Sequence, residues 1–379
     1  MPSEKDLTVE VLTGVRAVPA AEWDALLSPE DTPFVRHAWL SSLEDAGCVR
    51  PEVGWLPRTL VVREAGRLVA AAPVYLKGNS EGEFVFDHSW HRFAERLGVA
   101  YLPKLIVAVP FTPATGRRLL VAPGQDRGTW SLVLSRALRE LVRELDVSSA
   151  HVLFAQEGDA DALVEDGWAP RVGVQFHWEN HGYSTYDDFL ATFNAKRRHQ
   201  LKRERREVLA SGLDVRTYRG SEITDEVMSA MERFYLASVE RFHPWTRQYL
   251  NRAFFDLVLS RMPESIEIVL ARDAGRPIAG AFNVSGGGRL YGRYWGAVEE
   301  RPFLHFHVCY YHSIEDCIAR GLSAFEPGAG GEHKLPRGFE PRLTRSAHVL
   351  VDPRLDRAVR QFVAQEKAAI ESELAGRDA

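Results

Sequence analysis

The sequence predicts a mixed α+β fold made of two similar domains in tandem. Its 379 residues exceed what a single core usually holds, because chains beyond about 250–300 residues divide into domains. Two stretches about 209 residues apart resemble each other, namely TLVVREAGRLVAAA (Thr59–Ala72) and EIVLARDAGRPIAGA (Glu267–Ala281). Each consists of two apolar strands around an Ala-Gly turn, which is typical of a β-hairpin. The sequence around each hairpin also corresponds, so we expect an internal repeat.

The first half begins with a strand at Leu7–Thr13. Helices are expected at Ala21–Leu27 and His37–Ala46, before the hairpin. Apolar residues at helical spacing then predict a long helix at Trp130–Leu145. The half closes with a strand, a short helix ended by Gly167 and a last strand, at His151–Ala155, Ala160–Asp166 and Val172–Trp178.

The polar segment Glu179–Tyr186 is the expected join, which gives domains at 1–179 and 180–379. In the second half a strand and two helices precede the hairpin, at Leu213–Tyr218, Asp225–Glu240 and Gln248–Ser260. A further strand, the helix Leu304–Ala319 and a strand ending in a glycine-rich turn come after it. The chain finishes with a strand and an amphipathic helix, at Ala347–Val351 and Leu355–Glu373.

Composition narrows the class of protein. The N-terminus carries acidic residues and no signal-peptide core, and no window approaches eighteen consecutive apolar residues, so we expect no membrane insertion. Three cysteines without paired spacing indicate reduced thiols and a cytoplasmic protein. The net charge of −5 argues against a protein that binds nucleic acid over most of its surface, but it is compatible with a local basic patch.

The segment Leu290–Arg345 holds the predicted catalytic residues. Its second strand ends in a glycine-rich turn that carries Glu332, His333 and Lys334. Loops at strand ends are where α/β folds place their chemistry. In this turn Glu332 or His333 is suited to accept a proton, and Lys334 is suited to bind a phosphate or a developing oxyanion. The alternative is an ordinary solvated turn.

Three further features have both a functional and a structural interpretation. Arg293 and Trp295 share one face of an aromatic strand, where a guanidinium needs a ligand or an ion-pair partner. The segment 194–207 has seven Lys or Arg against two acids, so it is either a solvated helix face or a site for a phosphate-bearing substrate through Lys196, Arg197, Arg198 and Lys202. His305, Cys309, His312 and Asp316 lie at steps of four, three and four on a helix, but one helix face seldom supplies a whole zinc site, and we predict no metal.

The element order and several long motifs resemble the acyl-CoA N-acyltransferase (GNAT) superfamily, in particular FemAB-like proteins of the bacterial peptidoglycan biosynthesis/recognition branch. The motifs include FVRHAWLSSLE, PVYLKGNSEGEFVFDHSW, YLPKL and PFTPATGRRLL in the first half, and LYGRYWGA, LHFHVCYYHSIEDCI and FEPGAGGEHKLPRGFEP in the second. The resemblance implies two tandem GNAT-like domains, each a mostly antiparallel sheet flanked by helices. It also implies binding roles for Arg337 and Phe339, and an acceptor site shaped by Asp87, His88, Trp90 and Lys104.

One departure from the family pattern concerns the donor. CoA-using members carry a basic-x-x-Gly-x-Gly/Ala turn that binds pyrophosphate through backbone N–H groups. The matching stretch here, Gly296–Phe306, has two acids and no second glycine. We therefore keep both acyl-CoA and aminoacyl-tRNA as candidate co-substrates, with no tightly bound cofactor.

The function expected from the sequence is N-acyl transfer by the second half, while the first half shapes the acceptor site. The acceptor would be a small-molecule or peptide amine, and the donor site would accept a tRNA acceptor end if the donor is charged tRNA. The alternatives are a catalytically inactive protein that binds a peptide or cell-wall precursor, and a metal-dependent hydrolase that uses the His305 face with Glu332.

Overall fold

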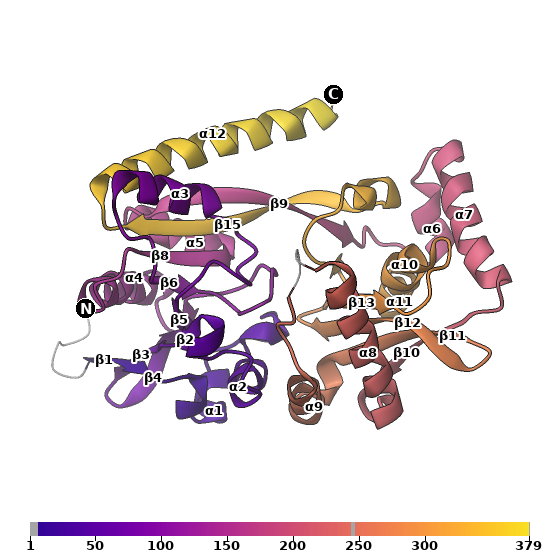
Figure 1. Ribbon diagram of the computed structural model, residues 1–379, viewed down its shortest axis with the longest axis horizontal. Coiled ribbons are helices and arrows are strands. Elements are labelled where there is room, and N and C mark those ends of the chain that lie inside the picture. The colour runs from indigo at the N-terminus through magenta and orange to yellow at the C-terminus, as the bar shows by residue number, and fades with distance from the viewer. Residues whose placement is uncertain (1–6, 244–246, 379) are drawn as a thin grey trace. The chain divides into compact units, whose positions relative to one another are not determined.

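The computed structural model describes residues 7–243 and 247–378, which form two compact units (Figure 1). Unit 1 contains the chain up to Val174 and again from Leu343 onward, and unit 2 is Gln175–Arg342. We expected the C-terminal strand and helix in the second domain, whereas the structure assigns them to unit 1. The reason is apolar burial: Leu355, Val359 and Val363 pack in one core cluster with Trp90 of unit 1.

Unit 1 contains two sheets. The first has the order β1-β3-β4-β7 and is antiparallel (Leu7–Leu12, Thr59–Glu64, Arg67–Ala72, Leu120–Val121). In the second, β15 (Glu340–Leu350), β8 (Ser149–Ala155), β6 (Lys104–Val107), β5 (Val74–Lys77) and β2 (Trp55–Pro57) are neighbours in that order. Its only parallel pair among the described strands is β6 with β8. Among the candidate residues of the first half, Lys104 lies on β6.

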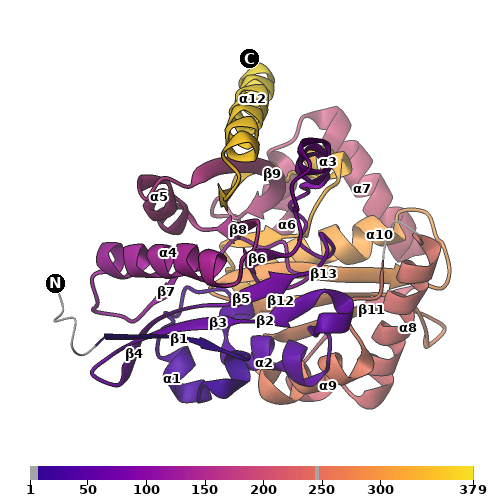
Figure 2. The ribbon, with the colours of Figure 1, turned by 60° about the vertical axis from the view of Figure 1, so that its left-hand side comes forward.

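Helices cover the sheets of unit 1. Helix α4 (Arg127–Glu144) packs on β4, β7 and β8 through Leu134, Leu138 and Leu141 (Figure 2). Helix α12 (Pro353–Asp378) packs on α3 (His88–Leu97). The remaining α-helices of the unit are α1 (Ala20–Asp24), α2 (His37–Asp45) and α5 (Glu157–Glu165). The helices predicted in this half are therefore present, with ends that differ by a few residues.

Unit 2 has one sheet with the order β10-β11-β12-β13-β14 (Asp214–Arg219, Ile266–Asp273, Arg276–Gly286, Arg289–Ala297, Ala324–Glu326). Strand β14 runs parallel to β13, and Phe325 pairs with Trp178 at the end of β9 (Ala169–Glu179). Helix α8 (Asp225–Arg241) packs on β11–β13, and α9 (Arg252–Arg261) packs on α8. Helices α6 (Tyr186–Ala191) and α7 (Ala195–Ala210) precede the sheet, while α10 (Leu304–Phe306) and α11 (His312–Arg320) come after β13. Unit 2 is thus a mostly antiparallel sheet flanked by helices, as predicted.

The internal repeat is confirmed at its two hairpins. The strands β3 and β4 turn at Ala65 and Gly66 with φ of 47° and 78°, and β11 and β12 turn at Ala274 and Gly275 with φ of 46° and 82°. Two positive φ angles are the signature of a type I′ turn, which matches the twist of a two-residue hairpin. In both units the first strand pairs with the first hairpin strand. Over the described ranges 7–243 and 247–378, no helix combines the length and apolarity needed to cross a bilayer.

Candidate functional site

The glycine-rich turn of unit 2 holds Lys334 in a buried position. The turn comes after β14 and leads into a 3₁₀ helix at Glu332–Arg337. Its Gly328 and Gly331 have φ of +89° and +96°, a backbone conformation that side-chain-bearing residues rarely adopt. Lys334 is 2% exposed and its Nζ donates to the carbonyl oxygen of Gly328 at 2.6 Å. Burial lowers the pKa of Lys334 to about 8, so the ammonium is poorly solvated and poised to stabilise a developing negative charge.

Arg337 fixes the other end of this turn. Its guanidinium donates to Glu204 Oε2 (2.8 Å), to the Tyr311 hydroxyl (2.9 Å) and to the carbonyl oxygen of His333 (2.8 Å). It also lies 3.4 Å from the centre of the Phe306 ring. These contacts tie Arg337 to the backbone of His333 and to Glu204, and its binding role stays a prediction.

Phe339 is 2% exposed and packs between Tyr310 and Phe325, at ring-centre distances of 5.1 and 5.8 Å. Its binding role stays a prediction. Glu332 lies in the 3₁₀ helix, but its side chain is outside the part of the structure that is described. Its catalytic role stays a prediction.

His333 lies among aromatic side chains that lead to a pocket. Its Nε2 is 2.9 Å from the Tyr310 hydroxyl, and its ring is 5.9 Å from that of His305. His305 in turn lies 5.1 Å from the Trp295 ring. Burial lowers the pKa of His305 to about 4, and burial with the nearby Lys334 and Arg337 lowers the pKa of His333. Both imidazoles are thus neutral at pH 7 and able to accept a proton.

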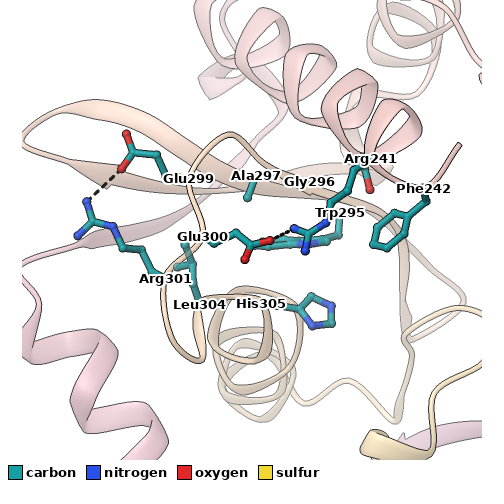
Figure 3. A pocket seen from close by; sticks show the side chains of 11 residues that line it. Arg241, Phe242, Trp295, Gly296, Ala297, Glu299, Glu300, Arg301, Leu304 and His305 are labelled. Atoms are coloured by element: carbon teal, nitrogen blue, oxygen red, sulfur yellow. Dashed lines mark hydrogen bonds and ion pairs between the residues drawn. The ribbon is translucent and has the colours of Figure 1, made fainter.

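A pocket of about 400 Å³ begins at His305 and Trp295 (Figure 3). It lies between the end of α8, strand β13 and the loop 298–303, and its wall includes Ser238, Arg241, Phe242, Gly296, Ala297, Glu299, Glu300, Arg301 and Leu304. The loop presents carboxylates: Glu300 pairs with Arg241, while Glu299 pairs with Arg276 and Arg301. Sequence reasoning identified Trp295 but missed Arg241 and Phe242, because they come from the end of a helix some 50 residues earlier in the chain.

The His/Cys/Asp set of the predicted 304–319 helix does not share one face. The helix has a π-helical turn at His307–Tyr311 between α10 and α11, which adds a residue to that turn and rotates the residues after it. His312 Nε2 lies 2.8 Å from Thr217 Oγ1, and Asp316 accepts from Arg219 and Arg320. Among the residues that the structure describes, no group of three or more His, Cys, Asp or Glu is placed to hold a metal ion.

The basic segment forms helix α7, whose exposed face carries Lys196 and Lys202. Leu201 and Val208 are buried and attach the helix to the unit. Arg197 donates to Gln200 (2.9 Å), Lys202 pairs with Asp187 of α6 (2.9 Å), and Arg198 is partly buried. An open groove of about 640 Å³ between α6 and α7 is lined by Asp187, Leu190, Lys202, Arg205, Arg206, Leu209 and Ala210. This surface can attract an anionic substrate.

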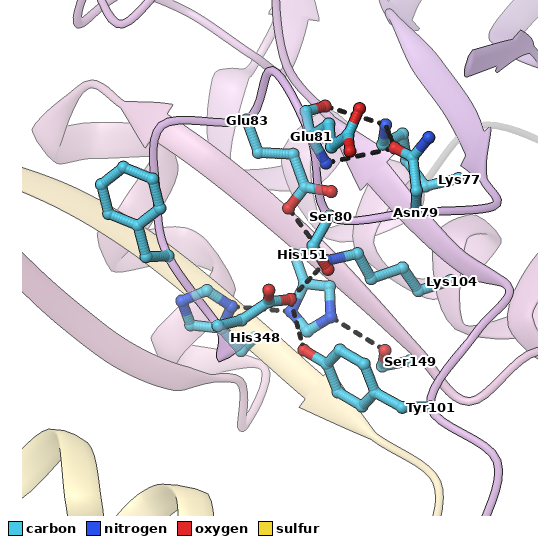
Figure 4. A network of polar contacts seen from close by, with 12 residues as sticks. Lys77, Asn79, Ser80, Glu81, Glu83, Tyr101, Lys104, Ser149, His151 and His348 are labelled. Atoms are coloured by element: carbon cyan, nitrogen blue, oxygen red, sulfur yellow. Dashed lines mark hydrogen bonds and ion pairs between the residues drawn. The ribbon is translucent and has the colours of Figure 1, made fainter. Parts of the chain in front are cut away.

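Three of the four predicted residues of the first half lie together in unit 1, and the fourth, His88, lies apart from them. Lys104, Asp87 and Trp90 are buried and belong to one polar cluster (Figure 4). His88 lies instead at the exposed start of α3, where its ring stacks on Phe86 at 5.9 Å. In unit 2, Arg293 lies on strand β13, and burial lowers its pKa. Sequence reasoning missed Lys77, His151 and His348, whose strands meet only in the folded sheet, and Glu83 and Tyr101, which lie in the loops before α3 and β6.

Three solved structures share this fold. FemX aligns over 90% of this chain and 98% of its own, with 13% identity and a TM-score of 0.55. The C-terminal domain of a putative lysylphosphatidylglycerol synthetase from Agrobacterium fabrum aligns over 91% and 95%, with 12% identity and a TM-score of 0.56. L-PGS from Bacillus licheniformis aligns over 85% and 95%, with 10% identity and a TM-score of 0.51.

Sequence comparison gives the family. No curated protein sequence matches the chain. The FemAB-like family model, described as peptidoglycan biosynthesis/recognition, matches residues 14–378 and so nearly the whole length. Together with two units of GNAT-like, mostly antiparallel architecture, this match shows that the chain belongs to the FemAB-like family.

Proposed function

We propose that unit 2 transfers an acyl or aminoacyl group from an activated donor to the amine of a small molecule or peptide, such as a cell-wall precursor. The observation that carries this proposal is the buried Lys334 ammonium next to a neutral His333. Both lie near the pocket that His305 and Trp295 line. These groups supply the two requirements of acyl transfer, a cation for the oxyanion and a base for the amine proton. The family match supports acyl or aminoacyl transfer in general terms.

The proposed steps use only groups of this chain. The lone pair of the acceptor amine attacks the carbonyl carbon of the donor ester or thioester, and Lys334 donates a hydrogen bond to the resulting oxyanion. In the tautomer that carries its proton on Nε2 and donates it to the Tyr310 hydroxyl, His333 has its lone pair on Nδ1, where it takes the proton of the attacking nitrogen. The C–O or C–S bond then breaks, and the leaving oxygen or sulfur receives that proton.

Within this proposal we favour aminoacyl-tRNA over acyl-CoA as the donor. The loop that would hold a CoA pyrophosphate lacks the family's second glycine, and Glu299 and Glu300 neutralise the arginines beside it in ion pairs. The helix after the loop has only three α-helical residues before its π turn, so it offers no regular N-terminus to an anion. The basic face of α7 provides positive charge for the phosphates of a tRNA end. The loop therefore argues against CoA, while α7 is compatible with RNA.

The test is thermal unfolding with charged tRNA, uncharged tRNA, acetyl-CoA or a longer acyl-CoA. A ligand at about a hundred times its dissociation constant adds about 2.7 kcal/mol to the stability of the folded state. We expect charged tRNA to raise the unfolding temperature and the CoA thioesters to leave it unchanged. The Lys334→Met variant should lose most of the preference for charged over uncharged tRNA, and Lys367→Met on the exposed end of α12 serves as the matched control.

Transfer itself is measured with radiolabelled aminoacyl-tRNA and a panel of amine acceptors. His333→Ala should lower the rate about 10²–10⁴-fold, the usual contribution of general-base catalysis. A shift with acetyl-CoA that is lost in Lys334→Met would replace tRNA with CoA as the donor. If no donor shifts the unfolding temperature and no product forms, transfer is rejected.

A further inference from the structure

Three aromatic side chains line the pocket of unit 2, and the proposed reaction leaves them unused (Figure 3). Trp295 comes from β13, His305 from α10, and Phe242 from the residue that ends α8. The ring centres of Trp295 and His305 are 5.1 Å apart, and Phe242 is 48% exposed. The pocket volume of about 400 Å³ falls in the range of about 300–1,000 Å³ that small-molecule sites occupy.

A glycine brings the end of α8 to this pocket. An added Cβ at Gly296 would lie 1.8 Å from the carbonyl oxygen of Phe234, so α8 lies against β13 only because residue 296 has no side chain. The end of the same helix then places Arg241 and Phe242 at the pocket. Strand β14 pairs with β13 as far as Tyr291, so it stops short of the pocket. The pocket is therefore built by unit 2 alone.

The walls of the pocket are aromatic, while its rim is charged. Arg241 and Glu300 form an ion pair on the rim, and their side chains are 57% and 72% exposed. Burial lowers the pKa of His305 to about 4, so its ring is uncharged at pH 7. A planar heteroaromatic base has the same division, because its faces stack on aromatic rings and its edges form hydrogen bonds. An aliphatic group would use only the walls.

The pocket lies close to the proposed site of transfer. The ring centres of His333 and His305 are 5.9 Å apart, and His305 is itself part of the pocket wall. In an aminoacyl-tRNA the ester is carried by the ribose of the terminal adenosine, so the adenine lies near the reacting carbonyl. In CoA the long pantetheine arm separates the adenine from the thioester. We propose that this pocket binds the adenine of a terminal adenosine against the rings of Trp295 and Phe242.

This assignment rests on the proposed function only for the adenosine's role as the end of the donor; binding of the base requires no transfer. The edge of adenine carries an amine that donates hydrogen bonds and ring nitrogens that accept them. The rim offers both kinds of partner, since Glu300 and Ser238 accept and Arg241 donates. Because Arg241 and Glu300 are more than half exposed, their pair contributes little to stability and separates at low cost.

The experiment measures binding of AMP by NMR on the full-length protein, without an activated donor or an acceptor. The nine tryptophans give nine indole N–H signals in a TROSY spectrum, and a Trp295→Phe variant identifies that of Trp295. Titration with AMP should shift the Trp295 signal to saturation, whereas ribose 5-phosphate, which lacks the base, should not. Phe242→Ala should weaken AMP binding about fivefold to a hundredfold, the usual contribution of one stacked ring. Phe242→Tyr keeps the ring and should bind AMP as the parent does.

The matched control is Phe86→Ala in unit 1, where the ring is 66% exposed and away from the pocket; it should leave the affinity for AMP unchanged.

Two further ligands identify the source of the adenosine. The trinucleotide CpCpA, the end of a tRNA, should bind more tightly than 3′,5′-ADP, the nucleotide end of CoA. The reverse order would also support an adenine pocket and would make CoA its source.

Three results would overturn the assignment: an unmoved Trp295 signal, equal shifts with AMP and ribose 5-phosphate, or unchanged affinity in Phe242→Ala. A shift with phenylalaninamide in place of AMP would also overturn it, because the pocket would then hold the side chain of the transferred group. Loss of AMP binding in a protein that still forms product would reject this pocket alone, whereas AMP binding without product would reject only the transfer proposal.

Discussion

The ion pair between Arg337 and Glu204 gives the sharpest prediction about the stability of unit 2. The two side chains are 8% and 2% exposed, and Nη2 lies 2.8 Å from Oε2. Replacing Arg337 by methionine leaves the Glu204 carboxylate buried with only Tyr311 and Gln200 as partners. Removing one partner of a buried pair costs about 3–5 kcal/mol, and the lost contact with the Phe306 ring adds about 0.5–2 kcal/mol. We therefore expect Arg337→Met to lower the free energy of unfolding by about 3.5–7 kcal/mol.

The measurement is urea unfolding with matched variants. The control is Arg203→Met on α7, the helix that carries Glu204. Arg203 pairs with Glu207 at 3.6 Å, and both side chains are about half-exposed, so this change should cost less than about 1 kcal/mol. Adding Glu204→Met to Arg337→Met should recover part of the loss, because it removes the unpaired buried charge. The reasoning is refuted if Arg337→Met costs no more than Arg203→Met, or if the double variant is less stable than Arg337→Met.

Named contacts support three further predictions. Burial raises the pKa of Glu204, but hydrogen bonds from Tyr311, Gln200 and Arg337 outweigh this effect and hold the pKa below its usual 4.5. The stability that the Glu204 carboxylate contributes is therefore present above pH 4.5 and is lost as the pH falls below that value. Acid titration should therefore destabilise Glu204→Gln less than the parent. Burial lowers the pKa of Lys334 to about 8, which means that the fold penalises the charged form of this side chain. We therefore expect Lys334→Met to be as stable as the parent at pH 7, or more stable by about 1–2 kcal/mol, while its transfer activity falls. Marked destabilisation would contradict this. Gly296→Ala should cost more than about 3 kcal/mol, since the new Cβ would lie 1.8 Å from the Phe234 carbonyl oxygen, whereas Gly275→Ala, in open space at φ +82°, should cost about 1 kcal/mol in thermal unfolding.

Part of the candidate site could be predicted from neighbouring residues in the sequence, and part could not. The turn with His333 and Lys334 was predictable because glycines and charges come directly after a strand. The ion pair of Arg337 was not, because Glu204 lies 133 residues earlier in the chain and meets it only through the packing of α7. The regular spacing of His305, Cys309, His312 and Asp316 was misleading, since a π turn alters the helical register without any sequence signal we recognised.

By itself, the sequence determined the elements and their repetition. Hydrophobic periodicity and Ala-Gly turns are local properties, so the hairpins at Ala65 and Ala274 and the helices around them could be predicted from neighbouring residues. Only the tertiary structure decided which unit the C-terminal helix joins, because Leu355 and Val359 are compatible with any apolar face and only the fold shows which face is uncovered. It also decided the buried cluster around Lys104, whose members come from β5, β6, β8, β15 and the segment before α3. Charges so far apart in the chain come together only when the strands pair, since burial and pairing are properties of the assembled sheet.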